Sequence, residues 1–224
     1  MNAIRLACAA LLLPLAACAS TAAPRAQPWD NARQLIVVAT ADWDAPTGTL
    51  RAFERVVGSW RETTPGFTVN VGRNGSGWGL GLHDARDQDA GPVKREGDGR
   101  APAGVFAIGT AFGYAPQIST GLAYQAMRAN DWCIDVPDSP LYNRIVDRSL
   151  AKAPGLDQAS EPMRRDLQPK PDDLYKLGFV IDHNARAMPR GGSCIFAHVQ
   201  RGTDMPTAGC TSMPGDALRG LLAW

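Results

Sequence analysis

The sequence shows no excess of charge of either sign. Its 224 residues include 23 lysines and arginines against 22 aspartates and glutamates. A balance this close generates no overall field that would attract nucleic acid or an acidic surface. We therefore expect no nucleic-acid partner, and any partner has to be inferred from a local site.

Histidine is scarce, and the patterns that hold metal ions are missing. The chain has 3 histidines and 5 cysteines, with no Cys-x-x-Cys pair and no histidines at the spacing of metal ligands. Zinc sites in proteins depend on such groups. We expect neither a metal nor another cofactor.

The N-terminal hydrophobic run is too short for a transmembrane helix. It extends over 14 residues from Leu6 to Ala19, follows Arg5 and ends in small residues, whereas a helix needs ~20 residues to cross a bilayer. A short apolar run behind a basic residue is typical of an export signal.

This signal contains the sequence Leu15-Ala16-Ala17-Cys18, which resembles a bacterial lipobox. We expect residues 1–18 to be a signal peptide with lipobox, Cys18 to carry a lipid anchor for the membrane, and residues 19–33 to form a tether. Cleavage at an Ala-x-Ala site near Ala19 or Ala23 is the alternative. Either route places the mature protein in the oxidising periplasm or cell envelope.

Three cysteines remain for the folded part, because Cys8 lies in the signal and Cys18 is the lipid site. They are Cys133, Cys194 and Cys210. In an oxidising compartment an odd number leaves either one free thiol or an intermolecular bridge. We expect a disulfide between Cys133 and Cys194, since each lies in a strand-like run and their pairing leaves Cys210 free.

Short β-branched runs separated by turn signals predict a mostly β fold over residues 34–224. The runs are QLIVVAT, FTVNVG, GVFAIGT, WCIDV, GFVIDH and SCIFAHV, and the turns include RNGSG, EGDGRAPAG, VPDSP and PRGGS. This density of turns is typical of an antiparallel sandwich or barrel of short strands with a few short helices. We expect a single domain.

Three other segments carry expectations about local structure. LRAFERVVGSW fits either a helix or a hairpin, and we favour strands; the residues after Pro214 predict a short terminal helix. The segment 151–173 is rich in proline and charge and predicts a long surface loop. The charged stretches VKRE and MRRD predict solvated surface.

The candidate active residues are His198, at the end of a strand-like run, and Cys210, twelve positions later in a Thr-Ala-Gly-Cys turn. A catalytic cysteine reacts as the thiolate, so it needs an acceptor for its proton. His198 can be that base, and the helix after Pro214 would add positive charge near the sulfur. Gly209 lets backbone amides approach a reacting carbonyl. The alternatives are an inert buried thiol and a core histidine.

Four further residues are weaker candidates for contacts with a substrate. Tyr142 and Asn143 lie in SPLYNRIV, and His183 and Asn184 lie in VIDHN. For His183, a bond to the backbone or to a loop is an equally good interpretation.

Three separated stretches resemble one protein family. They are VKREGDGRAPAGVFAIG over residues 93–109, IFAHV over residues 195–199, and TAGC over residues 207–210. Together they resemble the catalytic domain of L,D-transpeptidases of the YkuD type, over about residues 35–224. Ala208 and Ser212 stand where many members have a histidine and an arginine or asparagine.

The resemblance implies a YkuD-like β fold and an enzyme of the bacterial cell wall. Cys210 would form a thioester with a peptidoglycan stem peptide, His198 would be the base, and the turn of Thr207, Ala208 and Gly209 would support the oxyanion. The alternatives are an L,D-carboxypeptidase or other cysteine hydrolase, and a wall-binding lipoprotein without turnover.

Overall fold

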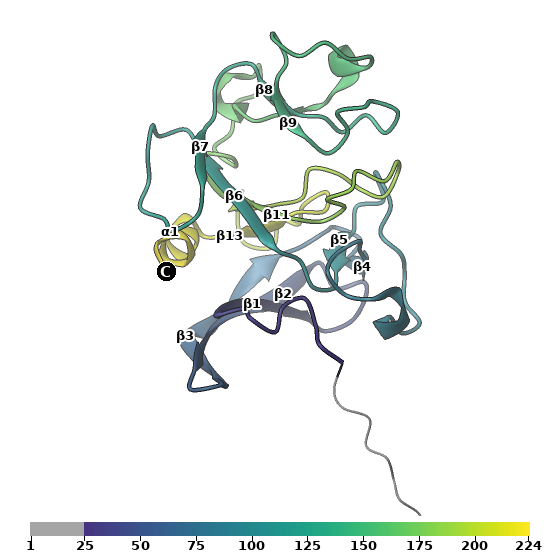
Figure 1. The fold of residues 1–224 in the computed structure, drawn as a ribbon. Coiled ribbons are helices and arrows are strands. Elements are labelled where there is room, and N and C mark those ends of the chain that lie inside the picture. The colour runs from purple at the N-terminus through teal and green to yellow at the C-terminus, as the bar shows by residue number, and fades with distance from the viewer. Residues whose placement is uncertain (1–24) are drawn as a thin grey trace, which may run out of the picture.

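The computed structural model describes residues 25–224, which form a mostly β fold with one α-helix (Figure 1). The expected signal peptide, Cys18 and residues 19–24 of the expected tether lie outside the described residues. Within residues 25–224, no helix has the length and hydrophobicity needed to cross a membrane.

A mixed sheet of eight strands forms the centre of the fold. Its strands, in order across the sheet, are β1 (Gln34–Thr40), β2 (Thr47–Val56), β3 (Ser59–Asn70), β13 (Thr211–Met213), β12 (Phe196–Val199), β11 (Leu177–Ile181), β6 (Ile108–Gly113) and β7 (Tyr124–Ala126). The mostly β prediction is therefore confirmed.

The expectation of antiparallel pairing holds for only part of this sheet. The pairs β12–β13 and β6–β7 are parallel. Their connections, residues 200–210 and 114–123, return the chain to the end of the sheet at which the first strand of each pair began. The next strand can then run in the same direction. Parallel neighbours require such crossovers, and turn signals alone do not reveal the return.

Two smaller sheets complete the architecture. One contains β10 (Glu161–Pro162), β8 (Asp131–Cys133) and β9 (Ile145–Asp147), and it forms a lobe, residues 128–173, at the top of Figure 1. The other pairs β4 (Ser76–Trp78) with β5 (Ala101–Ala103) in parallel. Three short 3-10 helices lie at Ala85–Asp87, Leu156–Gln158 and Arg165–Leu167.

The ambiguous segment LRAFERVVGSW forms a hairpin, as expected. Strands β2 and β3 pair in it as far as Val56 opposite Ser59, and the two turn residues, Val57 and Gly58, both have positive φ. Two successive positive φ values are the geometry of a tight hairpin turn. The terminal helix is also confirmed: α1 (Gly215–Ala223) follows Pro214 and buries Leu218 and Leu222.

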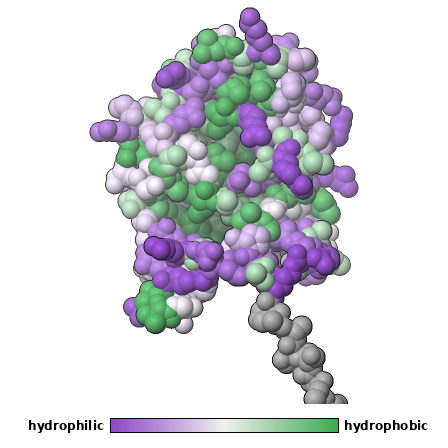
Figure 2. Space-filling model, viewed as in Figure 1, coloured by the Kyte–Doolittle hydropathy of each residue, from purple (hydrophilic) through white to green (hydrophobic). Residues whose placement is uncertain are grey.

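The large sheet is covered by hydrophobic side chains on both faces. Ala111 and Ala197 belong to the core that includes α1, whereas their neighbours Phe112 and Phe196 belong to the core under the lobe. This division follows from the alternation of side chains along a strand. In the view of Figure 2, hydrophobic side chains gather over the middle of the molecule, above a band of more hydrophilic ones.

The segment 151–173 is only partly the surface loop that we expected. It contributes β10 to the lobe, and Met163 is completely buried. Its proline and charge obscured this anchoring, because the buried part is only a few residues long.

Candidate active site

A pocket of about 450 Å³ lies between the large sheet and the lobe. The sheet and the turn before β13 contribute His198, Cys210 and Ser212, and the lobe contributes Glu161 and Arg165. The pocket is therefore formed by segments that are far apart in the sequence.

The register of two strands places His198 and Cys210 on the same side of the sheet. In the parallel pair β12–β13, His198 lies opposite Ser212, and Ala197 lies opposite Thr211. Extending this register puts Cys210 beside Phe196, whose backbone N–H donates to Cys210 Sγ at 3.4 Å. The two candidate residues are thus offset by two positions on adjacent strands, and both line the pocket.

The hydrogen bonding of His198 leaves one ring nitrogen available as a base. Its Nδ1 lies 2.8 Å from the carbonyl oxygen of Val199, so this nitrogen carries the proton and donates it. The tautomer leaves Nε2 as the acceptor. Burial lowers the pKa of His198 to about 4, so the ring is neutral at neutral pH.

Cys210 rests as a protonated thiol. Its Sγ donates to the carbonyl oxygen of Cys194 at 3.5 Å, and its side chain is buried. Burial, and secondarily the nearby carboxylate of Glu161, raises the pKa of this thiol to about 12. The resting pair is therefore a neutral thiol and a neutral imidazole, and the histidine would act as a general base during attack.

The turn before Cys210 is held by its own threonine. Thr207 Oγ1 accepts a hydrogen bond from the Gly209 N–H at 3.0 Å and donates one to the carbonyl oxygen of Cys210 at 2.7 Å. Thr207, Ala208 and Gly209 all border the pocket. Because the Gly209 amide is engaged within the turn, the Cys210 amide is the better candidate donor to an oxyanion.

The terminal helix does not lie where we expected it to assist the sulfur. Strand β13 separates Cys210 from the start of α1 at Gly215. Four extended residues span about 13 Å, and the field of a helix terminus falls off within about one turn. The protonated resting thiol is consistent with this separation.

None of the four weaker candidates lines the pocket. Tyr142, Asn143, His183 and Asn184 lie in the layer of residues behind its lining. Tyr142, His183 and Asn184 are buried. The Asn143 side-chain amide donates to the carbonyl oxygens of His183 and Asn184 at 2.9 and 3.0 Å, and its oxygen accepts from Cys194 N–H at 2.8 Å. In the structure these residues position the loop that carries Cys194.

Other buried contacts connect this layer to the pocket. Tyr142 donates through its hydroxyl to Glu96, and Ser193 Oγ donates to the same carboxylate oxygen at 2.7 Å. Glu96 and Ser193 both line the pocket. Nδ1 of His183 accepts from Leu80 N–H at 3.2 Å, and burial lowers the pKa of His183 to about 4.

Cys133 and Cys194 form a disulfide, and the only free cysteine among residues 25–224 is Cys210. The disulfide connects β8 of the lobe to the loop before β12. It therefore ties together two of the walls of the pocket.

Sequence reasoning missed the charged residues of the pocket. The expectation of a solvated VKRE stretch is wrong for Lys94, which is buried, lines the pocket and pairs with Asp98 at 2.7 Å. The expectation for MRRD is likewise wrong for Arg165, which is three-quarters buried and lines the pocket. One local pattern could have indicated that Lys94 is paired, namely the acidic residue Asp98 four positions later, next to two glycines.

No group of three or more histidines, cysteines, aspartates or glutamates within residues 25–224 is arranged to hold a metal ion. Comparisons of the chain with protein-family models, with curated proteins and with solved structures found no match.

Proposed function

We propose that this protein is an exported, lipid-anchored L,D-transpeptidase of the YkuD type that acts on peptidoglycan stem peptides through Cys210. The observation that carries the proposal is that the three stretches of the resemblance meet at one pocket. The three stretches that resemble the family are far apart in the sequence, yet each contributes to one pocket: Lys94 from the first, His198 from the second and Cys210 from the third.

The acylation step follows from the positions of the two central residues. His198 Nε2 takes the proton of the Cys210 thiol as the sulfur attacks the carbonyl carbon of the stem peptide. The Cys210 N–H donates to the oxygen that becomes negative. When the tetrahedral intermediate collapses, the C–N bond breaks, and the imidazolium of His198 returns the proton to the leaving amine. A thioester remains on Cys210.

The second half of the reaction reverses these roles. Neutral His198 takes a proton from an acceptor amine, which attacks the thioester carbonyl. The C–S bond breaks, the proton returns to sulfur, and a new amide leaves the pocket. Water in place of the amine would give hydrolysis by the same steps.

The charges in the pocket support a peptide substrate that carries both ammonium and carboxylate groups. Lys94, Arg165 and Arg201 bring positive charge to the lining, and Glu96, Glu161 and Asp135 bring negative charge. Opposite charges at separate positions can fix the direction of such a peptide. The resemblance implies the stem peptide as that substrate.

The decisive experiment compares wild type with Cys210→Ala on a disaccharide tetrapeptide, with and without an amine acceptor. Mass spectrometry should detect loss of the terminal residue and a new amide for wild type, and neither for Cys210→Ala. A shortened peptide without a new amide would identify a carboxypeptidase. Equal binding of both proteins to purified sacculi, with no product from either, would identify a wall-binding protein.

Because the resemblance implies acylation of the family's cysteine by carbapenems, a second experiment locates the nucleophile. Wild type should gain the mass of the carbapenem, and Cys210→Ala should not. His198→Ala should lower the turnover rate by on the order of 10² to 10⁴, the range for loss of general-base assistance.

A further inference from the structure

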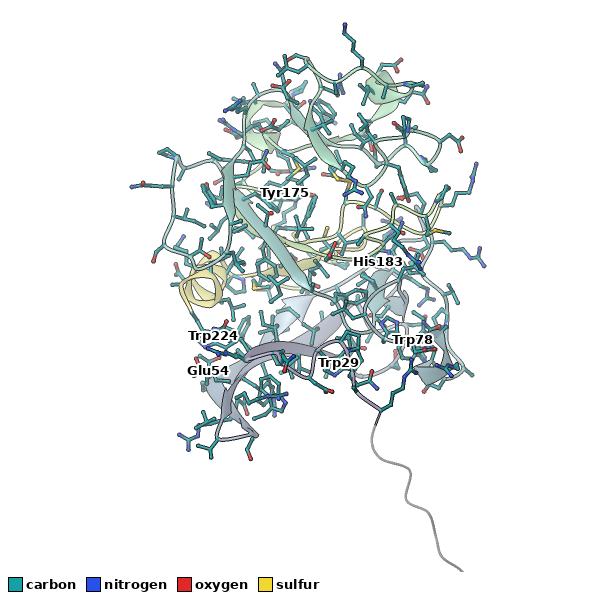
Figure 3. The ribbon with its side chains drawn as sticks, in the orientation of Figure 1. Trp29, Glu54, Trp78, Tyr175, His183 and Trp224 are labelled. Atoms are coloured by element: carbon teal, nitrogen blue, oxygen red, sulfur yellow. A yellow bond between two sulfur atoms is a disulfide. The ribbon has the colours of Figure 1, made fainter. Side chains whose placement is uncertain are left out.

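Tyr175 links the two candidate catalytic residues to the lobe. It precedes β11, is 4% exposed, and lies between the large sheet and the lobe (Figure 3). Its ring packs edge-on against the imidazole of His198, with centroids 5.2 Å apart, and against Phe196, with centroids 5.4 Å apart. The position of this ring therefore limits how the His198 imidazole can turn.

Tyr175 shares the pocket with charged groups. It lines the pocket with Glu161, from β10, and with Cys210, and it belongs to the same buried cluster as Cys210. Its hydroxyl interacts electrostatically with both. The guanidinium carbon of Arg165 lies 5.3 Å from the centre of the tyrosine ring. One buried side chain thus contacts the nucleophile, the base and the lobe.

Glu161 is only partly neutralised by the arginine beside it. Arg165 forms two bonds of 2.8 Å to the oxygens of Asp172, whereas its nearest contact with Glu161 is 3.3 Å. Asp135, whose side chain accepts a bond from the Ser160 N–H at 2.9 Å, adds a second carboxylate to the same wall. Burial raises the pKa of Glu161, and above that pKa negative charge remains close to Tyr175 and to Cys210.

A buried carboxylate and a buried thiolate disfavour each other, because each charge raises the cost of the second. A hydroxyl that interacts with both groups can donate its single proton to only one of them at a time. Formation of the thiolate therefore depends on how the carboxylate is charged and on which group receives the tyrosine hydrogen bond.

We propose that Glu161 lowers the reactivity of Cys210 through Tyr175, which acts as a positioning residue for both Cys210 and His198. The proposal deepens the proposed function and rests on it only in taking Cys210 as the nucleophile. A change at the lobe that neutralises or displaces Glu161 would then increase the reactivity of the thiol.

The test measures alkylation of Cys210 by iodoacetamide from pH 6 to 10 in the full chain, with the Cys210 peptide quantified by mass spectrometry. Because the pKa of Cys210 lies near 12, alkylation should rise with pH over this whole range, and Glu161→Gln should shift the rise to lower pH by about one unit. The thiolate fraction then rises about tenfold and each thiolate becomes about threefold less nucleophilic. The net expectation at pH 8 is about threefold faster alkylation.

Tyr175→Phe should shift the profile in the opposite direction. The ring and its packing against His198 remain, but the hydroxyl that stabilises the thiolate is lost, so alkylation at pH 8 should be slower than in wild type. In the double variant the two effects should not add, because both act on the same sulfur.

Two matched variants control for general disturbance. Asp166→Asn removes a carboxylate of the same lobe that pairs with Arg164 and does not line the pocket. Tyr124→Phe removes a hydroxyl that donates to the Ala115 carbonyl, also away from the pocket. Both should leave the profile unchanged.

An unchanged profile for Glu161→Gln, or an equal shift for Asp166→Asn, would overturn the proposal. If Tyr175→Phe does not fold, the comparison of Glu161→Gln with Asp166→Asn decides the question. Alkylation requires no turnover, so failure of the stem-peptide assay would overturn the proposed function and leave this measurement valid.

Discussion

The Cys210 thiol donates a hydrogen bond to the carbonyl oxygen of Cys194, and Cys194 is itself bonded through its sulfur to Cys133. The resting position of the candidate nucleophile is therefore set by a residue of the disulfide. This relationship connects the stability of the lobe to the geometry of the reacting group.

Replacing both Cys133 and Cys194 by serine should destabilise the protein by about 4 kcal/mol in the chain-entropy treatment of a bridge across this separation. The residues are 61 positions apart in the sequence. Turnover should fall as well, because the disulfide fixes the position of the Cys194 backbone carbonyl that accepts from the Cys210 thiol. Urea denaturation of wild type and the double variant measures the first effect. An unfolding midpoint that the double substitution leaves unchanged would contradict the prediction.

The pH dependence of turnover should show an acid limb near pH 4. His198 has to be neutral to take the thiol proton, and burial lowers its pKa to about 4. An ordinary histidine would instead lose activity near pH 6.5. Measurements of kcat/KM from pH 3 to 8 distinguish the two cases, and a limb between pH 6 and 7 would contradict a base whose pKa is lowered by burial.

Stability should also decrease in acid because of the same histidine. The ordinary pKa of histidine is 6.5 and that of folded His198 is about 4, so between these values the unfolded chain binds a proton that the folded chain does not. The stabilisation is complete above pH 6.5 and is lost as the pH falls toward 4.

Between pH 7 and 5 this linkage amounts to about 2 kcal/mol for His198. Burial lowers the pKa of His183 to about 4 as well, which acts in the same direction over this interval, so the comparison that isolates His198 is wild type against His198→Gln. The variant should lose less free energy of unfolding over this interval. Equal losses in urea denaturation at the two pH values would contradict the assignment.

Asn143→Ala should destabilise the pocket wall. The side chain makes three hydrogen bonds to the backbone of His183, Asn184 and Cys194, and its loss leaves these groups without a partner. We expect a cost of about 2 to 4 kcal/mol. Asn130→Ala is the matched control, because that side chain is exposed. A cost for Asn143→Ala no larger than the control's would show that the wall does not depend on this amide.

The lipid anchor is tested by the intact mass of the protein after expression in a bacterial host. We expect a mature chain that begins at Cys18 and carries the mass of a diacylglyceryl group. Cys18→Ala should abolish the lipid mass. A chain that begins beyond residue 18 in the wild type would favour cleavage at an Ala-x-Ala site instead.

Local patterns predicted several strands of the large sheet and the terminal helix. Positions such as Phe196 and His198 alternate with Ala197 in a β-branched and aromatic context, and this pattern reports the strand and its two faces. The hairpin in LRAFERVVGSW was also foreseen, since its Val-Gly-Ser fits a turn. These features depend on a few neighbouring residues, which a single sequence displays.

The remaining site residues depend on contacts that no local pattern records. Glu161 and Tyr175 meet Cys210 only because the lobe folds over the large sheet, and Lys94 reaches the pocket from a turn more than a hundred residues away. In the sequence, Glu161 lies in a stretch that resembles solvated loop. For His183 and Asn184 the sequence could not separate two interpretations, since buried polar residues that hold a loop have the same composition as residues that bind a ligand.

The disulfide between Cys133 and Cys194 has a consequence for when the pocket can mature. It joins the lobe to the sheet that carries His198, and such bonds do not persist in the reducing cytosol. For an exported chain, the two parts become covalently joined only after translocation. The pocket of an exported chain would therefore reach its final geometry only after export.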